Sequence, residues 1–107
     1  MNKGDIVYIS FPFTDLSGVK MRPALIIEAQ DQDVIVIFIT SRIHQFDKDT
    51  DIIVHPDPSN RLKVISVFKP TKILTLSKKL VLAKTGVLDK STLDSIHKKI
   101  ITGLNLV

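Results

Sequence analysis

The chain has 107 residues, of which 44% are hydrophobic and 24% charged, and it contains no cysteine. This length and composition predict one globular domain over residues 1–107 and exclude an intrinsically disordered chain. The absence of cysteine excludes a disulfide scaffold, a cysteine-based zinc finger, an iron–sulfur site and a thiol nucleophile. No apolar run reaches the roughly 18 residues of a membrane span, and the first residues do not resemble a secretory signal, so we expect a cytoplasmic protein.

Charge is divided unevenly along the chain, although the formal net charge is only +4. Residues 1–59 hold five Lys or Arg against nine Asp or Glu, whereas residues 60–107 hold ten against two. A basic half on a small protein indicates a polyanionic partner, most often nucleic acid, and a solvated lysine surface is the alternative interpretation. The three histidines lie far apart and no carboxylates cluster at ligand spacing, so we expect neither a metal site nor a cofactor.

In the first half of the chain, short runs of apolar residues are typical of strands. We predict strands over residues 6–9, 24–27, 34–39 and 51–54, with a loop over residues 12–22. The run 24–27 carries no charge, which indicates that both of its faces are covered, and Pro23 stands at its first position, where proline is tolerated. The run 34–39 has the clearest strand pattern, with six apolar and mostly β-branched residues.

The second half continues with strands and then changes period. Further strands are predicted over residues 66–68, 72–76 and 85–88, with a turn at 56–60 and a single helical turn at 77–80. Pro70 between the first two of these strands indicates an edge position or a bulge. A final helix follows from the apolar spacing of Leu93, Ile96, Ile100, Ile101 and Leu104. Asp89 or Ser91 can cap its start, and Gly103 lies near its end.

The predicted elements indicate a mainly β protein, a small barrel-like sheet closed or flanked by one amphipathic helix. An open sheet fits the same pattern equally well.

Polar residues at strand ends are the candidates for chemistry, because rigid elements position reactive groups there. Arg22, with Lys20 two residues before it, can hold a phosphate through two parallel hydrogen bonds, or it can be a surface arginine paired with a carboxylate. The stretch 40–42, which is Thr-Ser-Arg, can donate hydroxyl hydrogen bonds to a phosphate or a developing oxyanion, or it can simply cap a turn.

Three further features are weaker candidates. Lysines at positions 63, 69 and 72 can follow a nucleic-acid backbone or form a solvated face. His44, just after the stretch 40–42, is the one histidine that we consider as an acid or base. Phe11, Phe13 and Tyr8 can stack on a base, although core packing is the simpler interpretation.

The order of several segments resembles the PemK/MazF-like toxins of bacterial type II toxin–antitoxin systems. The resemblance begins with Gly4-Asp5-Ile6-Val7, Phe11-Pro12-Phe13-Thr14-Asp15-Leu16-Ser17-Gly18 and Arg22-Pro23-Ala24-Leu25-Ile26-Ile27. It continues through the strand at 36–39 that leads into Thr40-Ser41, the stretches 62–66 and 72–78, and the final helix. It therefore covers nearly the whole chain.

This resemblance implies an SH3-like β-barrel that forms a homodimer and is blocked by a cognate antitoxin protein. It also implies metal-independent cleavage of single-stranded RNA, in which the 2′-hydroxyl attacks the adjacent phosphate and leaves 2′,3′-cyclic phosphate and 5′-hydroxyl ends. By position, Arg22 and Thr40 match the family's catalytic residues. We expect Arg22 to stabilise the charge on the phosphorane and Thr40 to bind the same phosphate, because the high pKa of arginine makes it a poor general acid. The expected substrate-binding residues are Lys20, Ser41, Phe11, Ser66 and Lys69.

The chain departs from the pattern at two positions. Where some members carry an active-site arginine and aspartate on a later strand, this chain has Lys69 and Thr71. Lysine keeps the charge but lacks the planar fork of arginine, and the carboxylate is absent, so no side chain is assigned as general base. A barrel that binds nucleic acid or protein without catalysis is therefore the alternative function.

Overall fold

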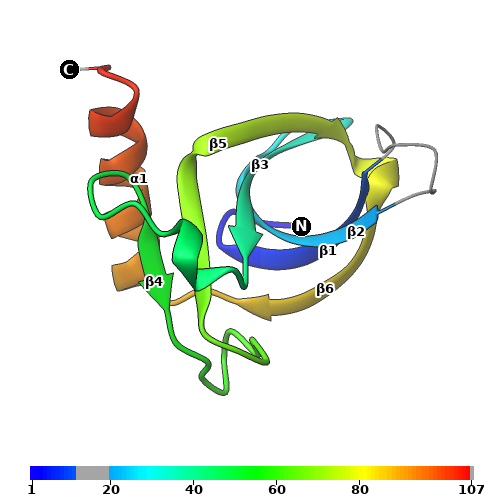
Figure 1. Ribbon diagram of the computed structural model, residues 1–107. Helices are drawn as coiled ribbons and strands as arrows, with labels where there is room; N and C mark the ends of the chain where they lie inside the picture. The colour runs from blue at the N-terminus through cyan, green and yellow to red at the C-terminus, as the bar shows by residue number, and fades with distance from the viewer. Residues whose placement is uncertain (12–19, 107) are drawn as a thin grey trace.

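The computed structural model describes residues 1–11 and 20–106, which form mainly strands (Figure 1). One helix, α1 (Lys90–Gly103), and two 3-10 turns, η1 (Ile43–Gln45) and η2 (Lys78–Leu80), complete the secondary structure of the described residues. The strands are β1 (Asp5–Phe11), β2 (Lys20–Ala29), β3 (Asp33–Thr40), β4 (Ile52–Val54), β5 (Ser66–Ser77) and β6 (Val81–Val87). The mainly β class, the final helix and the helical turn before β6 are confirmed.

All the strands belong to one curled antiparallel sheet in the order β4-β5-β3-β2-β1-β6. Figure 1 shows the sheet from β5 round to β6 curving into a ring, with β4 and α1 on one flank. The end strands β4 and β6 do not pair with each other in the part of the chain that the structure describes. The sheet is therefore an open barrel and not one closed by hydrogen bonds.

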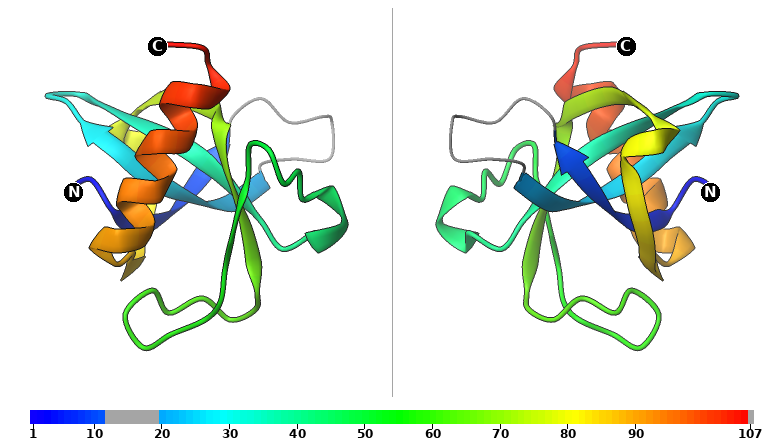
Figure 2. Two further views of the ribbon diagram at one scale, coloured as in Figure 1. Left: turned by 90° about the vertical axis from the view of Figure 1, so that its left-hand side faces the viewer. Right: turned by 90° about the vertical axis from the view of Figure 1, so that its right-hand side faces the viewer.

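The curled sheet buries side chains on both of its faces, and β3 shows why. Its residues alternate, so Val34 and Val36 join one apolar cluster while Ile37 and Ile39 join a second one. The second cluster is covered by α1, which lies across the outside of the sheet (Figure 2). Burial on both faces explains the apolar run over 34–39 except at Phe38, which is 36% exposed. The same cover, predicted for residues 24–27, is confirmed by the full burial of Ala24, Leu25 and Ile26.

Strand β2 starts earlier than its sequence indicates. Residues 20–22, predicted to end a loop, are paired with β1, and Pro23 is the fourth residue of the strand and not the first. Pro23 is tolerated because it lies opposite Tyr8 of β1, while pairing with β3 begins only at Ala24. The remainder of the predicted loop, residues 12–19, lies outside the described residues.

Strand β5 runs through the proline that separated the two predicted strands. Its register with β3 shifts between Ile37, which pairs with Ile73, and Phe38, which pairs with Lys69. The intervening residues 70–72 are extra and form the bulge that Pro70 predicted.

Helix α1 begins at the predicted cap. The Asp89 carboxylate accepts hydrogen bonds from the Thr92 backbone N–H at 2.9 Å and from the Thr92 hydroxyl at 2.7 Å. The predicted apolar stripe is only partly covered, because Ile96 is buried but Ile101 and Leu104 near the C-terminal end are about 40% exposed. No described helix combines the length and apolar character needed to cross a membrane.

Candidate functional site

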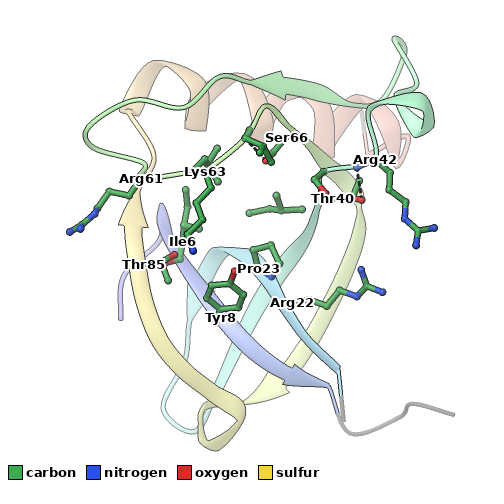
Figure 3. Close-up of a pocket in the computed structure, with 14 residues that line it drawn as sticks. Ile6, Tyr8, Arg22, Pro23, Thr40, Arg42, Arg61, Lys63, Ser66 and Thr85 are labelled. Carbon is green, nitrogen blue, oxygen red and sulfur yellow. Dashed lines mark hydrogen bonds between the residues drawn. The ribbon is translucent and has the colours of Figure 1, made fainter. Parts of the chain in front are cut away.

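A pocket of about 460 Å³ opens where the pairing between β2 and β3 stops (Figure 3). The ladder between these strands ends at Ala24 and Phe38, so the residues beyond, Arg22–Pro23 and Ile39–Thr40, are free to line the pocket. Other walls come from β1, from β6 and from the connection between β4 and β5. The lining residues are Ile6, Tyr8, Arg22, Pro23, Ile39, Thr40, Ser41, Arg42, Arg61, Leu62, Lys63, Val64, Ser66 and Thr85.

Four residues predicted for the site meet in this pocket: Arg22, Thr40, Ser41 and Ser66. The Thr40 hydroxyl oxygen accepts a hydrogen bond from the Arg42 backbone N–H at 3.1 Å. This contact fixes the Thr40 side chain and leaves its own proton available to donate. The Ser66 hydroxyl donates to the Val64 carbonyl at 3.0 Å, so only its oxygen lone pairs remain for a ligand.

Three other predicted residues do not line the pocket. Lys69 Nζ lies 2.7 Å from Asp51 Oδ2 and also donates to the Gln45 carbonyl, so its ammonium serves the protein's own structure. Phe11 is buried and packs edge-to-face on Phe38 with ring centroids 5.4 Å apart, as the core-packing interpretation expects. Lys20 is exposed on β2, two residues from Arg22 and therefore on the same face of the strand.

Of the remaining weaker candidates, some line the pocket and others do not. Lys63 lines the pocket, whereas His44, in the exposed turn η1, and Lys72 do not. Phe13 lies outside the described residues. Tyr8 lines the pocket with 37% of its surface exposed, so its ring is available to a ligand.

Cations dominate the polar part of the pocket. Arg22, Arg42, Arg61 and Lys63 line it. Within residues 1–11 and 20–106, no carboxylate or histidine lines it and none of these four cations forms an ion pair. In Figure 3 the side chains of Arg22 and Arg42 extend on one side of the pocket and that of Arg61 on the other. Unpaired cations on both sides of a concave surface attract an extended anion. In the described part of the chain, no group of three or more His, Cys, Asp or Glu side chains is placed to hold a metal ion.

The contributions of Arg61 and Thr85 were not apparent in the sequence. Arg61 follows the predicted turn at 56–60, and only the packing of that turn against β6 brings it to the pocket. A basic residue directly after a turn cluster, in the more basic half of the chain, was the available signal. No sequence pattern indicated Thr85. In the structure its hydroxyl donates to the Ile6 carbonyl within the sheet.

Comparison with known proteins identifies a family and several solved structures of similar fold. The chain matches the family model described as PemK-like, MazF-like toxin of type II toxin-antitoxin system over residues 2–104. No curated protein matches it significantly. Among solved structures, an endoribonuclease in complex with its cognate antitoxin, from a mycobacterial species, is 18% identical with a TM-score of 0.78, covering 100% of this chain and 97% of that one. MazF from Deinococcus radiodurans is 17% identical with a TM-score of 0.76, covering 98% and 96%. The Mycobacterium tuberculosis toxin MazF-mt6 is 19% identical with a TM-score of 0.75, covering 94% and 96%. At these identities the likeness establishes a shared fold.

Proposed function

Because the chain belongs to the PemK-like, MazF-like toxins of type II toxin–antitoxin systems, we propose that it is a metal-independent endoribonuclease that cleaves single-stranded RNA in the cationic pocket. The observation that carries this proposal is that Arg22, Thr40 and further cations line one concave surface. The endoribonuclease of similar fold supports the same reaction class.

In the proposed reaction the 2′-hydroxyl oxygen attacks the adjacent phosphorus and gives its proton to water. The bond from phosphorus to the 5′-oxygen breaks, and this oxygen takes a proton from water to become the 5′-hydroxyl end. Negative charge builds on the phosphorane oxygens in the transition state. The Arg22 guanidinium can donate two parallel hydrogen bonds to these oxygens, and the free Thr40 hydroxyl proton can donate a third. Ser41 lies beside Thr40 to bind the same phosphate, and Lys20 extends the positive charge along β2.

Among residues 1–11 and 20–106, no carboxylate and no histidine lines the pocket. We assign its rate acceleration to electrostatic stabilisation and to orientation of the 2′-hydroxyl, and we assign no side chain as the general base. The Tyr8 ring offers a stacking surface for a base next to the cleaved bond.

The same proposal includes two protein partners. The first is a cognate antitoxin that covers the pocket, because an endoribonuclease of similar fold is solved with its antitoxin. The second is another copy of this chain: the toxin is an SH3-like barrel that forms a homodimer in the cytoplasm. The exposed apolar side chains of Ile101, Leu104 and Leu106 supply surface for self-association. Sedimentation of the purified protein should give twice the mass of one chain. The mass of a single chain would refute the homodimer.

The proposed site is tested with Arg22→Ala. We expect a loss of at least about a hundredfold in the rate of RNA cleavage, as when one oxyanion donor is removed from an enzyme. Met21→Ala is the matched control, because Met21 is the neighbouring residue of β2, is 61% exposed and does not line the pocket. Equal cleavage rates for the wild type and Arg22→Ala would refute the site.

A non-catalytic binding barrel is the second candidate. It is favoured by the placement of Lys69, which is bound to Asp51 outside the pocket, and by the lack of a carboxylate or histidine among the lining residues in the described part of the chain. Under this alternative the protein binds single-stranded RNA and leaves it intact.

A further inference from the structure

Arg61 is held in a backbone conformation that arginine rarely adopts. Its φ is +55°, in the left-handed region where a Cβ crowds the backbone and glycine is favoured. The only other described non-glycine residue at positive φ is Asn105, at the end of α1, and asparagine tolerates this region. Strained residues persist where the surrounding structure determines them, and they often mark functional sites.

The segment Asp57–Lys63, called here the rim turn, is determined by its own hydrogen bonds. Asn60 is 1% exposed, and its side-chain oxygen accepts from the backbone N–H groups of Asp57 at 3.0 Å and Leu62 at 2.9 Å. Its side-chain nitrogen donates to the His55 carbonyl at 2.9 Å. The Arg61 N–H donates to the Asp57 carbonyl at 3.0 Å. These bonds fix the backbone on both sides of Arg61.

The rim turn is also attached to β6. The Val87 N–H donates to the Ser59 carbonyl at 3.0 Å, and the Ser59 hydroxyl donates to the Val87 carbonyl at 3.1 Å. Gly86 permits this approach, because a Cβ there would overlap the Asn60 carbonyl. The rim turn therefore places Arg61 at one fixed point on the pocket.

That point lies across the pocket from Arg22 (Figure 3). The exposed Arg61 has no ion-pair partner in the described part of the chain, and Lys63, two residues on, lines the same wall. Nothing in the fold of the described residues uses the Arg61 guanidinium, whereas its backbone conformation would be less strained with glycine. The strained backbone of Arg61 thus lowers the stability of the fold, and its side chain makes no contact that compensates within the described residues.

We propose that Arg61, together with Lys63, is a substrate-binding residue that holds a backbone phosphate of single-stranded RNA on the opposite side of the pocket from the phosphate at Arg22. The RNA then spans the pocket between two phosphate-binding points, which holds the nucleotides between them extended over Tyr8. This assignment rests on the proposed function in taking RNA as the ligand, but it concerns binding and does not require cleavage.

The test compares wild type with Arg61→Gly, using a single-stranded RNA oligonucleotide whose 2′-hydroxyls are methylated and therefore cannot attack. We expect Arg61→Gly to unfold at the same or a higher temperature, because glycine relieves the left-handed strain. It should bind the oligonucleotide about tenfold more weakly at low salt, as expected when one charged hydrogen-bond donor is removed. The slope of log K against log salt concentration should become shallower by about 0.7, because the variant neutralises one phosphate fewer.

Asn105→Gly is the matched control, since Asn105 has the same φ of 55° but lies outside the pocket. It should leave affinity and salt slope unchanged. Unchanged affinity and slope for Arg61→Gly, or a wild type that does not bind the oligonucleotide, would overturn the assignment. Binding that depends on Arg61 in a protein that does not cleave unmethylated RNA would instead refute the endoribonuclease and leave the assignment in place.

Discussion

Lys69 ties the connection between β3 and β4 to the sheet. Its ammonium reaches Asp51, whose side chain is 3% exposed, and it also donates to the Gln45 carbonyl at 3.1 Å. The same carboxylate accepts from the Asp47 N–H at 3.0 Å and from the Thr50 hydroxyl at 3.1 Å. One buried ion pair thus organises the segment that directly follows Arg42 at the pocket. Lysine suits this role because it delivers a compact charge at the end of a long stem.

Lys69→Met should lower the free energy of unfolding by about 3 kcal/mol or more, because it leaves the Asp51 carboxylate buried without its cation. Urea unfolding at neutral pH measures this change. Lys90→Met is the control, because Lys90 is 87% exposed in a pair with Asp94, and it should cost less than about 0.5 kcal/mol. A cost for Lys69→Met as small as that of the control would show that Lys69 is free for a ligand, as the sequence-based interpretation held.

Helix α1 depends on its cap because its apolar face is only partly buried. Thr92 donates to the Asp89 carboxylate through both its backbone N–H and its hydroxyl, and these hydrogen bonds lower the pKa of Asp89 below its ordinary value of 3.8. The bonds therefore favour the charged form, which also interacts favourably with the helix dipole.

Asp89→Ala should destabilise the protein by about 1 kcal/mol at neutral pH. Since the folded pKa lies below the unfolded one, this contribution is complete above the unfolded pKa and is lost as the pH falls through the folded pKa. The difference between wild type and variant should therefore shrink in acid. Chemical unfolding across this range measures it, with Asp94→Ala, in the exposed middle of the same helix, as the control. A difference that stays constant with pH would contradict the charged cap.

The elements that were predicted correctly are those whose own residues decide their state. The apolar run of β3 can be buried only as a strand covered by neighbours, and the spacing around Ile96 places its apolar residues on one face only in a helix. The local sequence pattern was therefore sufficient to predict both elements. The predicted start of β2 was wrong. The residues at its true start, Lys20, Met21 and Arg22, are exposed and precede a proline, which is also typical of a loop. Their extended state comes from pairing with β1, which is a tertiary contact.

At the scale of the whole molecule, the pocket joins the two oppositely charged halves of the sequence. Arg22 and Arg42 come from the half with excess acidic residues, and Arg61 and Lys63 come from the basic half. The charge balance therefore predicted a polyanionic partner but did not indicate where on the fold the site lies. Family resemblance directed attention to Arg22 and Thr40, whereas Arg61 required the rim turn to be attached to β6, an interaction with no local sequence pattern.

We propose, above all, that this cationic pocket cleaves RNA through attack by the 2′-hydroxyl without a metal ion. The most direct measurement is incubation of the purified wild-type protein with long single-stranded RNA in excess chelator, followed by analysis of the fragment ends. We expect cleavage at the same rate as without chelator, with 2′,3′-cyclic phosphate and 5′-hydroxyl ends. Intact RNA that is nevertheless bound, or fragments with 5′-phosphate ends, would contradict it.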